Sequence, residues 1–313
     1  MGGQPVLIAA EVRNLLDSSQ VEGLDVTWIP AGDPTPRGEW VALVPLLTRW
    51  VGGTELKNLP QLRIVANVAV GFNNVDVVAA QLRRVVVTNT PEVLTDATAD
   101  LTWALILACA RRLLEGVELV RSGQWLGWHP EQLLGLELRG RRLGLLGAGR
   151  IGQAVGLRAR VFGMEVLYST RTPKPAFEQQ TGANRVELGA LFRESDVLSL
   201  HVPAVPELQG IINPETLARM KTGAILINTS RGDLVREEAL AAALESGHLG
   251  AAGLDVYVDE PEIAPRLRAA PRTVLLPHIG SATRDTRRAM AGLAVANVQA
   301  VLAGKPPLTP VFR

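Results

Sequence analysis

The sequence predicts an α/β protein of two domains, each built on a doubly wound parallel sheet. Three observations support this fold class. The chain has 313 residues, more than a typical single domain. In both halves, short apolar or β-branched runs alternate with helical or polar stretches, as in parallel sheets. Between the halves, the apolar run 143–146 leads directly into Gly147, Gly149 and Gly152, which indicates a buried strand that turns tightly into a helix.

Composition restricts the classes of function. Hydrophobic residues make up 47% of the chain and charged residues 20%, which is ordinary for a globular protein. The net charge of +1, with acids and bases interspersed, gives no electrostatic reason to expect nucleic acid or an anionic membrane as a partner. No segment offers the roughly 18 uninterrupted apolar residues of a membrane span, and the start of the chain lacks a signal pattern. The single cysteine, Cys109, lies in an apolar run, so we expect it to be packed in the core. With one cysteine, no membrane span and no signal pattern, we expect a soluble, cytoplasmic protein.

The first half of the chain predicts one sheet followed by a helix. Strands are expected at 6–10, 25–30, 41–47, 63–70 and 85–89, with helical stretches such as 12–17 and 54–59 between them. Residues 95–121 carry apolar side chains at helical spacing, which predicts one long helix. Residues 122–140 combine glycines with bulky apolar side chains and have no clean period, so we expect a connecting arm.

The second half predicts a second sheet, which begins with the strand before the glycines. A helix is expected at 153–162, and further strands at 165–169, 196–202, 224–229, 251–256 and 273–276. An amphipathic helix is expected at 285–302, and the tail 304–313 is too rich in proline to continue it.

The three glycines after the strand at 143–146 predict a dinucleotide-binding turn. Gly147 permits the tight turn, Gly149 lets the backbone approach a pyrophosphate, and Gly152 lets the new helix pack on its strand. The helix N-terminus adds N–H groups and partial positive charge. Glycine triplets also occur in plain loops, but the apolar strand before this one and the helix after it favour a nucleotide site.

Three polar residues follow strands of the second sheet. Arg231, Glu260 and His278 each come just beyond a predicted strand end, where open α/β sheets bind ligands. Singly, each has a structural explanation: a turn cap, a solvated loop acid and a satisfied interior histidine. Together they suit hydride transfer to a 2-oxo acid. Arg231 would bind the substrate carboxylate and polarise the carbonyl, and His278 would donate a proton. We expect no metal ion in this site.

Nearly the whole chain resembles the D-2-hydroxyacid dehydrogenase family, especially its glyoxylate and hydroxypyruvate reductase branch. The order and spacing of the matching motifs make the resemblance specific. The matching stretches are 70–76, 93–99, the glycine motif 147–152, 228–232, 253–256, 259–261 and 277–283.

The resemblance implies a flavodoxin-like substrate domain, residues 1–97 and 287–313, into which a Rossmann dinucleotide-binding domain, residues 98–286, is inserted. It implies that Arg231 binds substrate, that Glu260 orients His278 and that His278 is the acid/base. Together with Arg231 and His278, Val70 and Gly71 would contact the substrate. The implied cofactor-binding residues are Thr95, Gly147, Gly149, Arg150, Ile151, Gly152, Ser169, Thr170, Arg171, His201, Val202, Pro203, Thr229, Ser230, Asp255, His278, Gly280 and Ser281.

Cofactor choice depends on the end of the second strand of the Rossmann fold. NAD-binding folds place an acid there to bind the ribose hydroxyls, but this chain has Ser169, Thr170 and Arg171, with Lys174 following. Glu165 opens the strand, and about 3.3 Å per residue leaves it roughly 13 Å away. Hydroxyls and an arginine suit a 2′-phosphate. We therefore expect NADP(H) to be preferred, with NAD(H) possible if Arg171 is only a solvated loop residue.

Two further expectations concern the arm and Arg236. The arm residues Trp125, Leu126 and Trp128 are too apolar to lie in water, so we expect a homodimer in which the arm wraps a partner and Trp128 reaches its substrate cleft. The alternative is that the arm packs on its own subunit. Arg236 stands where family members often have an acid, and the sequence does not explain it.

The preferred reaction is reduction of glyoxylate or hydroxypyruvate. Two other functions stay open at this stage. One is an NAD-dependent dehydrogenase of the phosphoglycerate or D-lactate type. The other is a cofactor-sensing scaffold like the co-repressors that share this fold, which the short chain without interaction tails disfavours.

Overall fold

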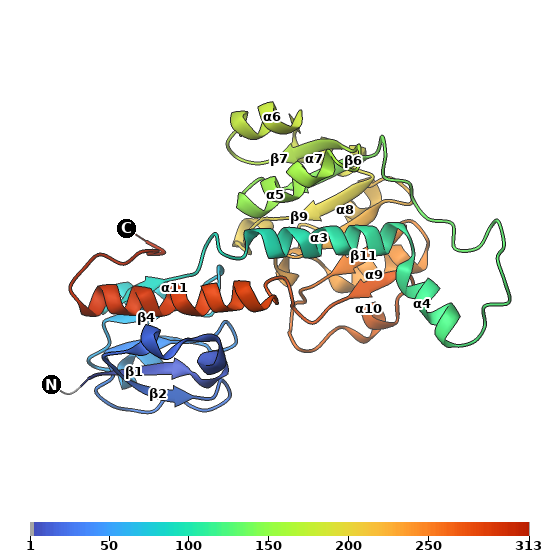
Figure 1. Cartoon of the computed structure of the whole chain (residues 1–313). Coiled ribbons are helices and arrows are strands. Elements are labelled where there is room, and N and C mark those ends of the chain that lie inside the picture. The colour runs from blue at the N-terminus through green and yellow to red at the C-terminus, as the bar shows by residue number, and fades with distance from the viewer. Residues whose placement is uncertain (1–2, 313) are drawn as a thin grey trace. The chain divides into compact units, whose positions relative to one another are not determined.

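The computed structural model describes residues 3–312, and the chain divides into two compact units (Figure 1). Unit 1 comprises Met1–Leu94 and Ser281–Arg313, of which 3–94 and 281–312 are described, and unit 2 comprises Thr95–Gly280. Each unit is built on a sheet whose strands pair in parallel, which confirms the predicted fold class. Nowhere in residues 3–312 is a helix both long and apolar enough to cross a membrane.

The sheet of unit 1 has five strands within the described residues, in the order β2-β1-β3-β4-β5, which is the order of flavodoxin-like folds. The strands are β1 (Gln4–Ala9), β2 (Leu24–Ile29), β3 (Ala42–Val44), β4 (Ile64–Ala66) and β5 (Val86–Thr88). The helices are the 3-10 helices η1 (Ala10–Leu15) and η2 (Ser18–Val21) and the α-helices α1 (Gly53–Asn58), α2 (Val77–Leu82) and α11 (Arg284–Leu302).

The sheet of unit 1 contributes to a continuous buried core. Leu7, Leu43 and Val87 pack with the buried residues of α1 and α2. Helix α11 contacts β3 and β4, so the last helix of the chain completes the first unit. After α11 the tail returns along β5, where the N–H of Val311 donates to the carbonyl of Val87 at 3.0 Å. The tail is not helical over its described residues, as its prolines predict.

Unit 2 contains a sheet of seven strands, in the order β12-β11-β10-β9-β6-β7-β8 along Thr95–Gly280. This is the Rossmann order with one further strand at an edge. The strands are β6 (Arg142–Leu146), β7 (Glu165–Ser169), β8 (Asn184–Arg185), β9 (Val197–Leu200), β10 (Ile225–Asn228), β11 (Ala251–Leu254) and β12 (Thr273–Leu275). The helices are α3 (Thr95–Ala110), α4 (Leu113–Arg121), α5 (Arg150–Ala159), α6 (Pro175–Thr181), α7 (Leu188–Glu194), η3 (Pro206–Leu208), α8 (Pro214–Arg219), η4 (Gly232–Leu234), α9 (Glu237–Glu245) and α10 (Pro265–Ala269).

Helices cover both faces of the Rossmann sheet. Leu145 and Ile227 face the core that includes α3, α5 and α6, whereas Leu146 and Leu226 face the core that includes α7 to α10. Neighbouring residues of one strand enter different cores because successive side chains point to opposite faces. The central strands β9, β10 and β11 are therefore mostly apolar, because both of their faces are buried.

The single long helix predicted for 95–121 is wrong. The segment forms two helices, α3 and α4, which are separated at Arg112, where φ is 53° and the backbone is left-handed. The carbonyl of Ala110 accepts the N–H of Leu136 at 2.8 Å, so the returning arm takes a hydrogen bond that a continuous helix would have used. A Cβ at Gly135 would overlap that carbonyl oxygen, so glycine permits the approach. A tertiary contact thus ends the helix at Ala110, although apolar side chains continue at helical spacing to residue 121.

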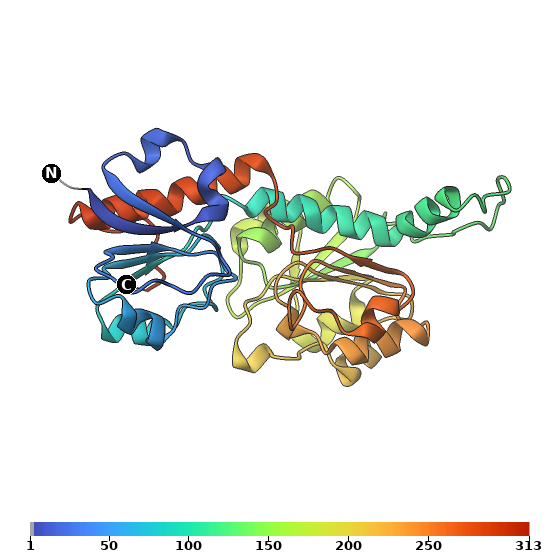
Figure 2. The ribbon, with the colours of Figure 1, turned by 90° about the horizontal axis from the view of Figure 1, so that it is seen from below.

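The arm has no regular helix or strand over residues 122–140, as predicted. Together with α4 it projects from the rest of unit 2, as Figure 2 shows in green at the right. Several predicted elements have different bounds in the structure. The strand expected at 63–70 ends at Ala66, and the helix expected at 153–162 runs from Arg150 to Ala159 instead. The two-residue strand β8 was not predicted.

Candidate active site

The turn between β6 and α5 carries the three glycines of the motif. Gly147 has a φ of 97°, in the left-handed region where a side chain is strained. A Cβ at Gly152 would overlap the carbonyl oxygen of Gly147, so glycine there lets α5 pack on the turn. A Cβ at Gly149 would meet nothing within 4 Å. Arg150 and Ile151 then open α5, so the open space beside Gly149 lies at a helix N-terminus, as a pyrophosphate site requires.

The end of β7 carries hydroxyls and basic side chains. Ser169 is the last residue of the strand, the Oγ1 of Thr170 donates to the carbonyl of Thr172 at 2.7 Å, and Arg171 is exposed. Glu165 lies at the other end of β7, where its carboxylate pairs with Arg142 at 3.2 Å. The carboxylate of Glu178 is also near the strand end, but it accepts the hydroxyl of Tyr168. That hydroxyl in turn accepts the N–H of Lys174 at 2.9 Å.

Arg185 holds the loop after β7, and sequence reasoning missed it. Its Nη2 donates to the carbonyls of Thr170 at 2.9 Å and of Arg171 at 3.1 Å. The residue lies in the short strand β8, which pairs with β7 through Leu167 and Tyr168. A two-residue strand has too little apolar pattern to be predicted, so the sequence offered no signal that Arg185 reaches this loop.

His201, Val202 and Pro203 follow β9 next to the glycine turn. Nε2 of His201 lies 2.9 Å from the Oγ of Ser199, and burial lowers the pKa of His201 to about 4. The imidazole is therefore neutral near pH 7. The carbonyl of His201 is among the atoms that a Cβ at Gly147 would meet, and the carbonyl of Val202 accepts the hydroxyl of Ser230. The ends of β9 and β10 thus lie beside the glycine turn.

Arg231 lies in a turn that the end of β10 holds rigidly. The side-chain amide of Asn228 donates to the carbonyl of Arg231 at 2.7 Å and accepts the N–H of Ser230 at 3.0 Å. Thr229 shares a hydrogen bond of 2.9 Å with Thr102 of α3. Burial lowers the pKa of Arg231, although the negative charges of Glu260 and Asp233 oppose that effect. Arginine stays charged throughout the physiological range, so the turn presents a partly buried cation.

Asp255, directly after β11, holds the backbone that follows His278. Its two carboxylate oxygens accept the N–H groups of Ile279 and Gly280, each at 2.7 Å. Burial raises the pKa of Asp255, while those two hydrogen bonds and the charge of His278 act in the opposite direction. Gly280 is tied to α3 as well, because its carbonyl accepts the hydroxyl of Thr98 at 3.2 Å. The backbone around the imidazole is therefore fixed from two elements.

Glu260 and His278 form a close pair beyond the carboxyl ends of β11 and β12. Oε2 of Glu260 lies 2.7 Å from Nδ1 of His278, and Oε1 accepts the N–H of Tyr257 at 3.0 Å. Both side chains are only partly buried, with exposed fractions of 32% for His278 and 29% for Glu260. Because Nδ1 is bound to the carboxylate, Nε2 is the ring nitrogen left for a substrate.

Unit 1 contains the loop predicted to contact substrate, residues 68–71. Its carbonyls are held by asparagines: the Nδ2 atoms of Asn67 and Asn89 donate to Gly71 at 2.9 Å and to Val70 at 2.8 Å. Asn67 also exchanges hydrogen bonds of 3.1 and 3.0 Å with Asn74. Asn67 and Asn89 are further residues that sequence reasoning did not identify, because their partners become clear only when the strands are paired.

Arg236 lies at the start of α9. It occupies the N-cap position and makes no side-chain cap hydrogen bond there, so α9 lacks the cap that an acid would supply. The guanidinium instead lies against Gly210, where a Cβ would overlap it. The first turn of α9 nevertheless holds two acids, Glu237 and Glu238, which suit the helix dipole.

The structure brings together much of the predicted site within unit 2. Arg231, Asp255, Glu260 and His278 all follow carboxyl ends of neighbouring strands, and their charges act on one another. Val70, Gly71 and Ser281 belong to unit 1. Within residues 3–312, no group of three or more His, Cys, Asp or Glu side chains is placed to hold a metal ion.

The family model for the NAD binding domain of D-isomer specific 2-hydroxyacid dehydrogenases matches residues 103–280, which include the glycine turn, Arg231, Glu260 and His278. The chain belongs to the D-isomer specific 2-hydroxyacid dehydrogenase family. As a member of that family it is an oxidoreductase with a Rossmann NAD-binding domain. The resemblance inferred from its motifs is confirmed.

Relatives within the family are similar over most of the chain. A glyoxylate reductase of Thermococcus litoralis is 48% identical over 270 residues, which is 85% of this chain and 82% of that protein. Among solved structures, a protein from Thermus thermophilus has a TM-score of 0.91 and 46% identity, covering 98% of this chain and 99% of the other. An NADPH-dependent glyoxylate/hydroxypyruvate reductase from Sinorhizobium meliloti, solved with NADP and malonate, has a TM-score of 0.90 and 33% identity, covering 99% and 97%.

Proposed function

We propose that this dehydrogenase is an NADPH-dependent reductase of short 2-oxo acids, converting glyoxylate to glycolate and hydroxypyruvate to D-glycerate. The observation that carries the proposal is the pairing of Glu260 with His278 near Arg231, at the strand ends beside the glycine turn. Glyoxylate reductase relatives such as that of Thermococcus litoralis support the substrate class. Unit 2 would bind the cofactor, and unit 1, with the loop 68–71, would serve as the substrate domain.

The residues around the glycine turn fit a dinucleotide. The space beside Gly149 that a Cβ would occupy, at the N-terminus of α5, suits a pyrophosphate. Asp255, Thr229 and Ser230 lie at strand ends where the nicotinamide half would bind, and His201 to Pro203 would line the adenine side. When bound, the cofactor supplies a hydride to the carbonyl carbon of the substrate.

The residues of this chain have separate tasks in the proposed reaction. The guanidinium of Arg231 binds the substrate carboxylate and draws electron density from the carbonyl, with a planar fork that matches a carboxylate. Nε2 of His278 donates a proton to the carbonyl oxygen as the carbon is reduced. Glu260 binds Nδ1 of His278 and stabilises the imidazolium form that donates the proton.

The loop after β7 supports a preference for NADPH. It contains Ser169, Thr170 and Arg171. Glu165 lies at the far end of β7, where it pairs with Arg142, and Glu178 accepts the hydroxyl of Tyr168. Arg185 donates to the carbonyls of Thr170 and Arg171, which fixes the loop backbone while the Arg171 side chain stays exposed. A 2′-phosphate would meet charged donors here.

Steady-state kinetics test the proposed function. Rates are measured with NADPH and with NADH over a panel of glyoxylate, hydroxypyruvate, pyruvate and phosphohydroxypyruvate. The proposal expects the highest kcat/KM for glyoxylate or hydroxypyruvate with NADPH. A preference for phosphohydroxypyruvate or pyruvate would replace the proposed substrate. A chain that binds cofactor but reduces none of these acids would favour a cofactor-sensing scaffold.

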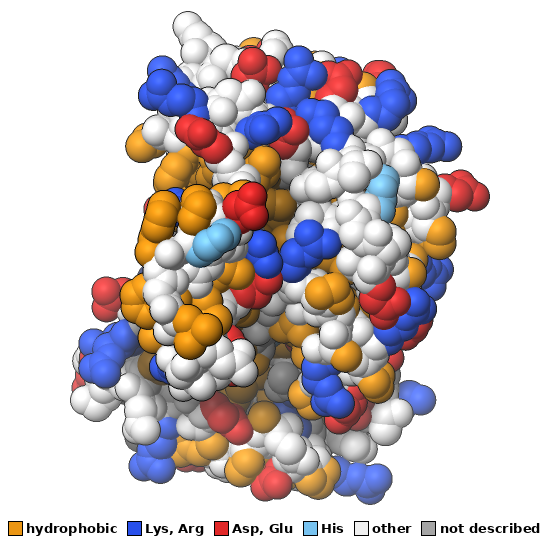
Figure 3. All heavy atoms as spheres, turned by 90° about the vertical axis from the view of Figure 1, so that its right-hand side faces the viewer, with side chains coloured by type: hydrophobic (Ala, Val, Ile, Leu, Met, Phe, Trp, Pro, Cys, Tyr) orange, Lys and Arg blue, Asp and Glu red, His pale blue; other side chains and the backbone are white. Residues whose placement is uncertain are grey.

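We also propose a homodimer in which the arm of one protomer lies on the other. Helix α4 exposes Leu113, Leu114, Val117 and Val120, each at least 46% exposed, and the arm exposes Leu126 at 98% and Trp128 at 82%. Figure 3 looks toward the end of the molecule from which the arm projects, and hydrophobic side chains lie among charged ones on this face. Apolar side chains this exposed are typical of an interface.

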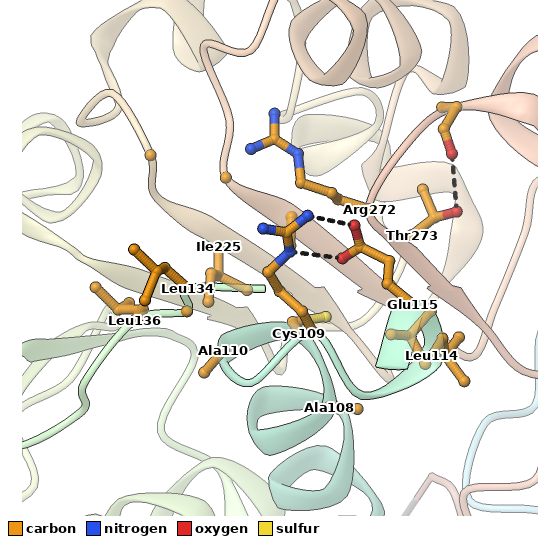
Figure 4. A pocket seen from close by; sticks show the side chains of 17 residues that line it. Ala108, Cys109, Ala110, Leu114, Glu115, Leu134, Leu136, Ile225, Arg272 and Thr273 are labelled. Carbon is orange, nitrogen blue, oxygen red and sulfur yellow. Dashed lines mark hydrogen bonds and ion pairs between the residues drawn. The ribbon is translucent and has the colours of Figure 1, made fainter. Parts of the chain in front are cut away.

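Two hollows flank α4 and would receive apolar groups of a partner. One, of about 410 Å³, lies at the amino ends of β10 to β12, on the sheet edge opposite to Arg231 and His278. Figure 4 shows Glu115 in its lining together with Leu114 and Leu134. Arg112, which also lines it, pairs with Glu115 at 2.6 Å. The other, of about 390 Å³, is lined by Leu114, Leu119 and Leu133 among others. Burial raises the pKa of Cys109, which also lines the first hollow, to about 12, so its thiol stays protonated and inert.

A further inference from the structure

The loop between β11 and α10 carries Glu260 and has no regular secondary structure over residues 256–264. A carboxylate on such a loop can orient a histidine only if other contacts fix the loop backbone. One contact lies within the loop, where the N–H of Tyr257 donates to Oε1 of Glu260 at 3.0 Å. Another joins the loop to the residue after β12, because the hydroxyl of Tyr257 donates to the carbonyl of Leu276 at 2.9 Å. These hold the beginning of the loop, and the N–H of Glu262 donates to the carbonyl of Asp259 at 2.9 Å within the turn of Glu260, so that turn still needs contacts that anchor it to the rest of unit 2.

Glu237 supplies that external support from the first turn of α9. Its Oε1 accepts the N–H of Val258 at 3.0 Å, and its Oε2 accepts the N–H of Ala264 at 3.2 Å. The two N–H groups lie on either side of Glu260 in the sequence. One carboxylate thus closes the segment 258–264 into a loop whose ends cannot separate. Glu237 is partly buried, whereas its neighbour Glu238 is exposed.

The same loop also packs against the turn that holds Arg231. A Cβ at Gly232 would overlap the backbone of Tyr257, so the two segments are in direct backbone contact. Helix α9 begins only a few residues after Arg231, and Glu237 ties that helix to the loop of Glu260. The Glu237 carboxylate thus links the loop of Glu260 to the helix that follows the Arg231 turn.

We propose that Glu237 is a positioning residue for the Glu260–His278 pair. It acts through the loop backbone and does not touch the substrate. The inference rests on the proposed function, because it assumes that His278 is the proton donor. It adds a requirement for an acceptor with two oxygens at position 237, since two N–H groups must be bound at once.

Replacing Glu237 by glutamine tests the need for two acceptor oxygens at this position. Glutamine keeps the size of the side chain but has one oxygen, and its NH2 group faces an N–H that needs an acceptor. In Glu237→Gln one end of the loop loses its hydrogen bond, and Glu260 is no longer held at 2.7 Å from Nδ1 of His278. Small displacements of a catalytic group are costly, so we expect kcat to fall roughly tenfold to a hundredfold. The KM for the 2-oxo acid and the Kd for NADPH stay close to those of the wild type.

The pH profile separates positioning from a loss of stability. Within unit 2, the charge of His278 acts on the carboxylates of Glu260 and Asp255, and Arg231 acts on Glu260 as well. Tyr257 also faces this group, and it is neutral near pH 7 because burial raises its pKa. Glu237→Gln does not replace any of these side chains, but it weakens the contact between the Glu260 carboxylate and the His278 imidazole. We expect the alkaline limb of kcat to move to lower pH, in the same direction as in Glu260→Gln.

A double-mutant cycle with a matched control tests the proposal. Glu237→Gln is made in the wild type and in Glu260→Gln, and Glu238→Gln serves as the control. Glu238 lies in the same helical turn, loses the same charge, and pairs with Arg266 at 3.4 Å. We expect Glu237→Gln to lower kcat in the wild type and to have little further effect when Glu260 is already changed. Glu238→Gln leaves kcat and its pH profile unchanged.

A second variant keeps the test valid if Glu237→Gln folds poorly. Ala264→Pro removes one N–H donor and leaves Glu237 in place, and the φ of −48° at Ala264 is close to that of proline. It should lower kcat in the same direction by a smaller factor. Equal effects of Glu237→Gln and Glu238→Gln, or additive effects in the cycle, would overturn the proposal. The cycle uses the best 2-oxo acid of the panel, and His278→Ala is run beside it. Full activity of His278→Ala would refute the proposed role of His278 itself, which distinguishes that failure from a failure of Glu237 alone.

Discussion

Oε2 of Glu260 lies 2.7 Å from Nδ1 of His278, which places a carboxylate directly against the imidazole. Burial works to raise the pKa of Glu260, but the hydrogen bonds from His278 and from the N–H of Tyr257 outweigh it and lower that pKa. The carboxylate is therefore ionised near neutrality, where its negative charge favours the protonated imidazole.

Glu260→Gln should move the alkaline limb of the reduction rate to lower pH. The amide keeps the shape of the side chain but not its charge, so the protonated imidazole no longer has a negative charge beside it. The measurement is kcat/KM for glyoxylate as a function of pH. An unchanged profile in an active variant would show that the pair does not control the proton.

Because the folded state lowers the pKa of Glu260, the charge of Glu260 contributes to the free energy of unfolding above pH 4.5, the usual pKa of glutamate. This contribution is lost as the pH falls below 4.5.

His278→Ala should lower kcat for reduction at least about a hundredfold, which is within the usual range for general acid catalysis. NADPH binding, followed by its fluorescence, should stay close to that of the wild type. His248→Ala is a suitable control, because His248 contacts the carbonyl of Leu217 on the other side of the unit. Near-normal turnover of His278→Ala would remove His278 from the mechanism.

Arg171→Ala should abolish the preference for NADPH. Charge-assisted hydrogen bonds contribute about 1.5 to 3 kcal/mol, so the wild type should favour NADPH over NADH by at least about tenfold in kcat/KM. The loss should occur mainly through a raised KM for NADPH. Arg160→Ala is the control, since Arg160 donates to the carbonyl of Gln180 at the surface. A wild type that prefers NADH would contradict the assignment of the β7 strand end.

Two glycine substitutions should separate cofactor binding from folding. Gly149→Ala adds a Cβ that meets no atom of the chain within 4 Å, so stability should be retained while the Kd for NADPH rises at least about tenfold. Gly152→Ala adds a Cβ that would overlap the carbonyl of Gly147, and overpacking of this kind costs about 1 to 3 kcal/mol of unfolding free energy. Thermal unfolding and NADPH titration measure the two effects. Unimpaired NADPH binding by Gly149→Ala would place the pyrophosphate elsewhere.

The purified protein should have twice the monomer mass of 33.5 kDa in light scattering at micromolar concentration. Leu126→Asp places a charge on the most exposed apolar side chain of the arm and should shift the population toward monomer. Leu82→Asp is the control, because Leu82 is 83% exposed on α2 and lies outside the arm. A monomer mass for the wild type would mean that the arm does not serve dimerisation.

The parts of the site that sequence reasoning found are those that local chemistry specifies. The strand before Gly147 and the three glycines lie within ten residues, so their spacing alone describes the turn. Arg231 and His278 were recognisable because carboxyl ends of parallel strands share one edge of a sheet, wherever those strands lie in the chain. The family motifs then connected Glu260 with His278, which the structure places in hydrogen-bonding contact.

Tertiary packing decided the features for which no local pattern exists. The break at Arg112 arises because the arm returns to take the carbonyl of Ala110, and a helical period cannot register that competition. Arg185 reaches the loop after β7 only because a two-residue strand pairs there. Glu237 looks like an ordinary acid in the first turn of a helix until the loop of Glu260 folds over it. Sequence periodicity and turn chemistry thus determined the sheets, the glycine turn and the strand-end residues, whereas hydrogen bonds between distant segments, which depend on the packed fold, decided how those residues are held.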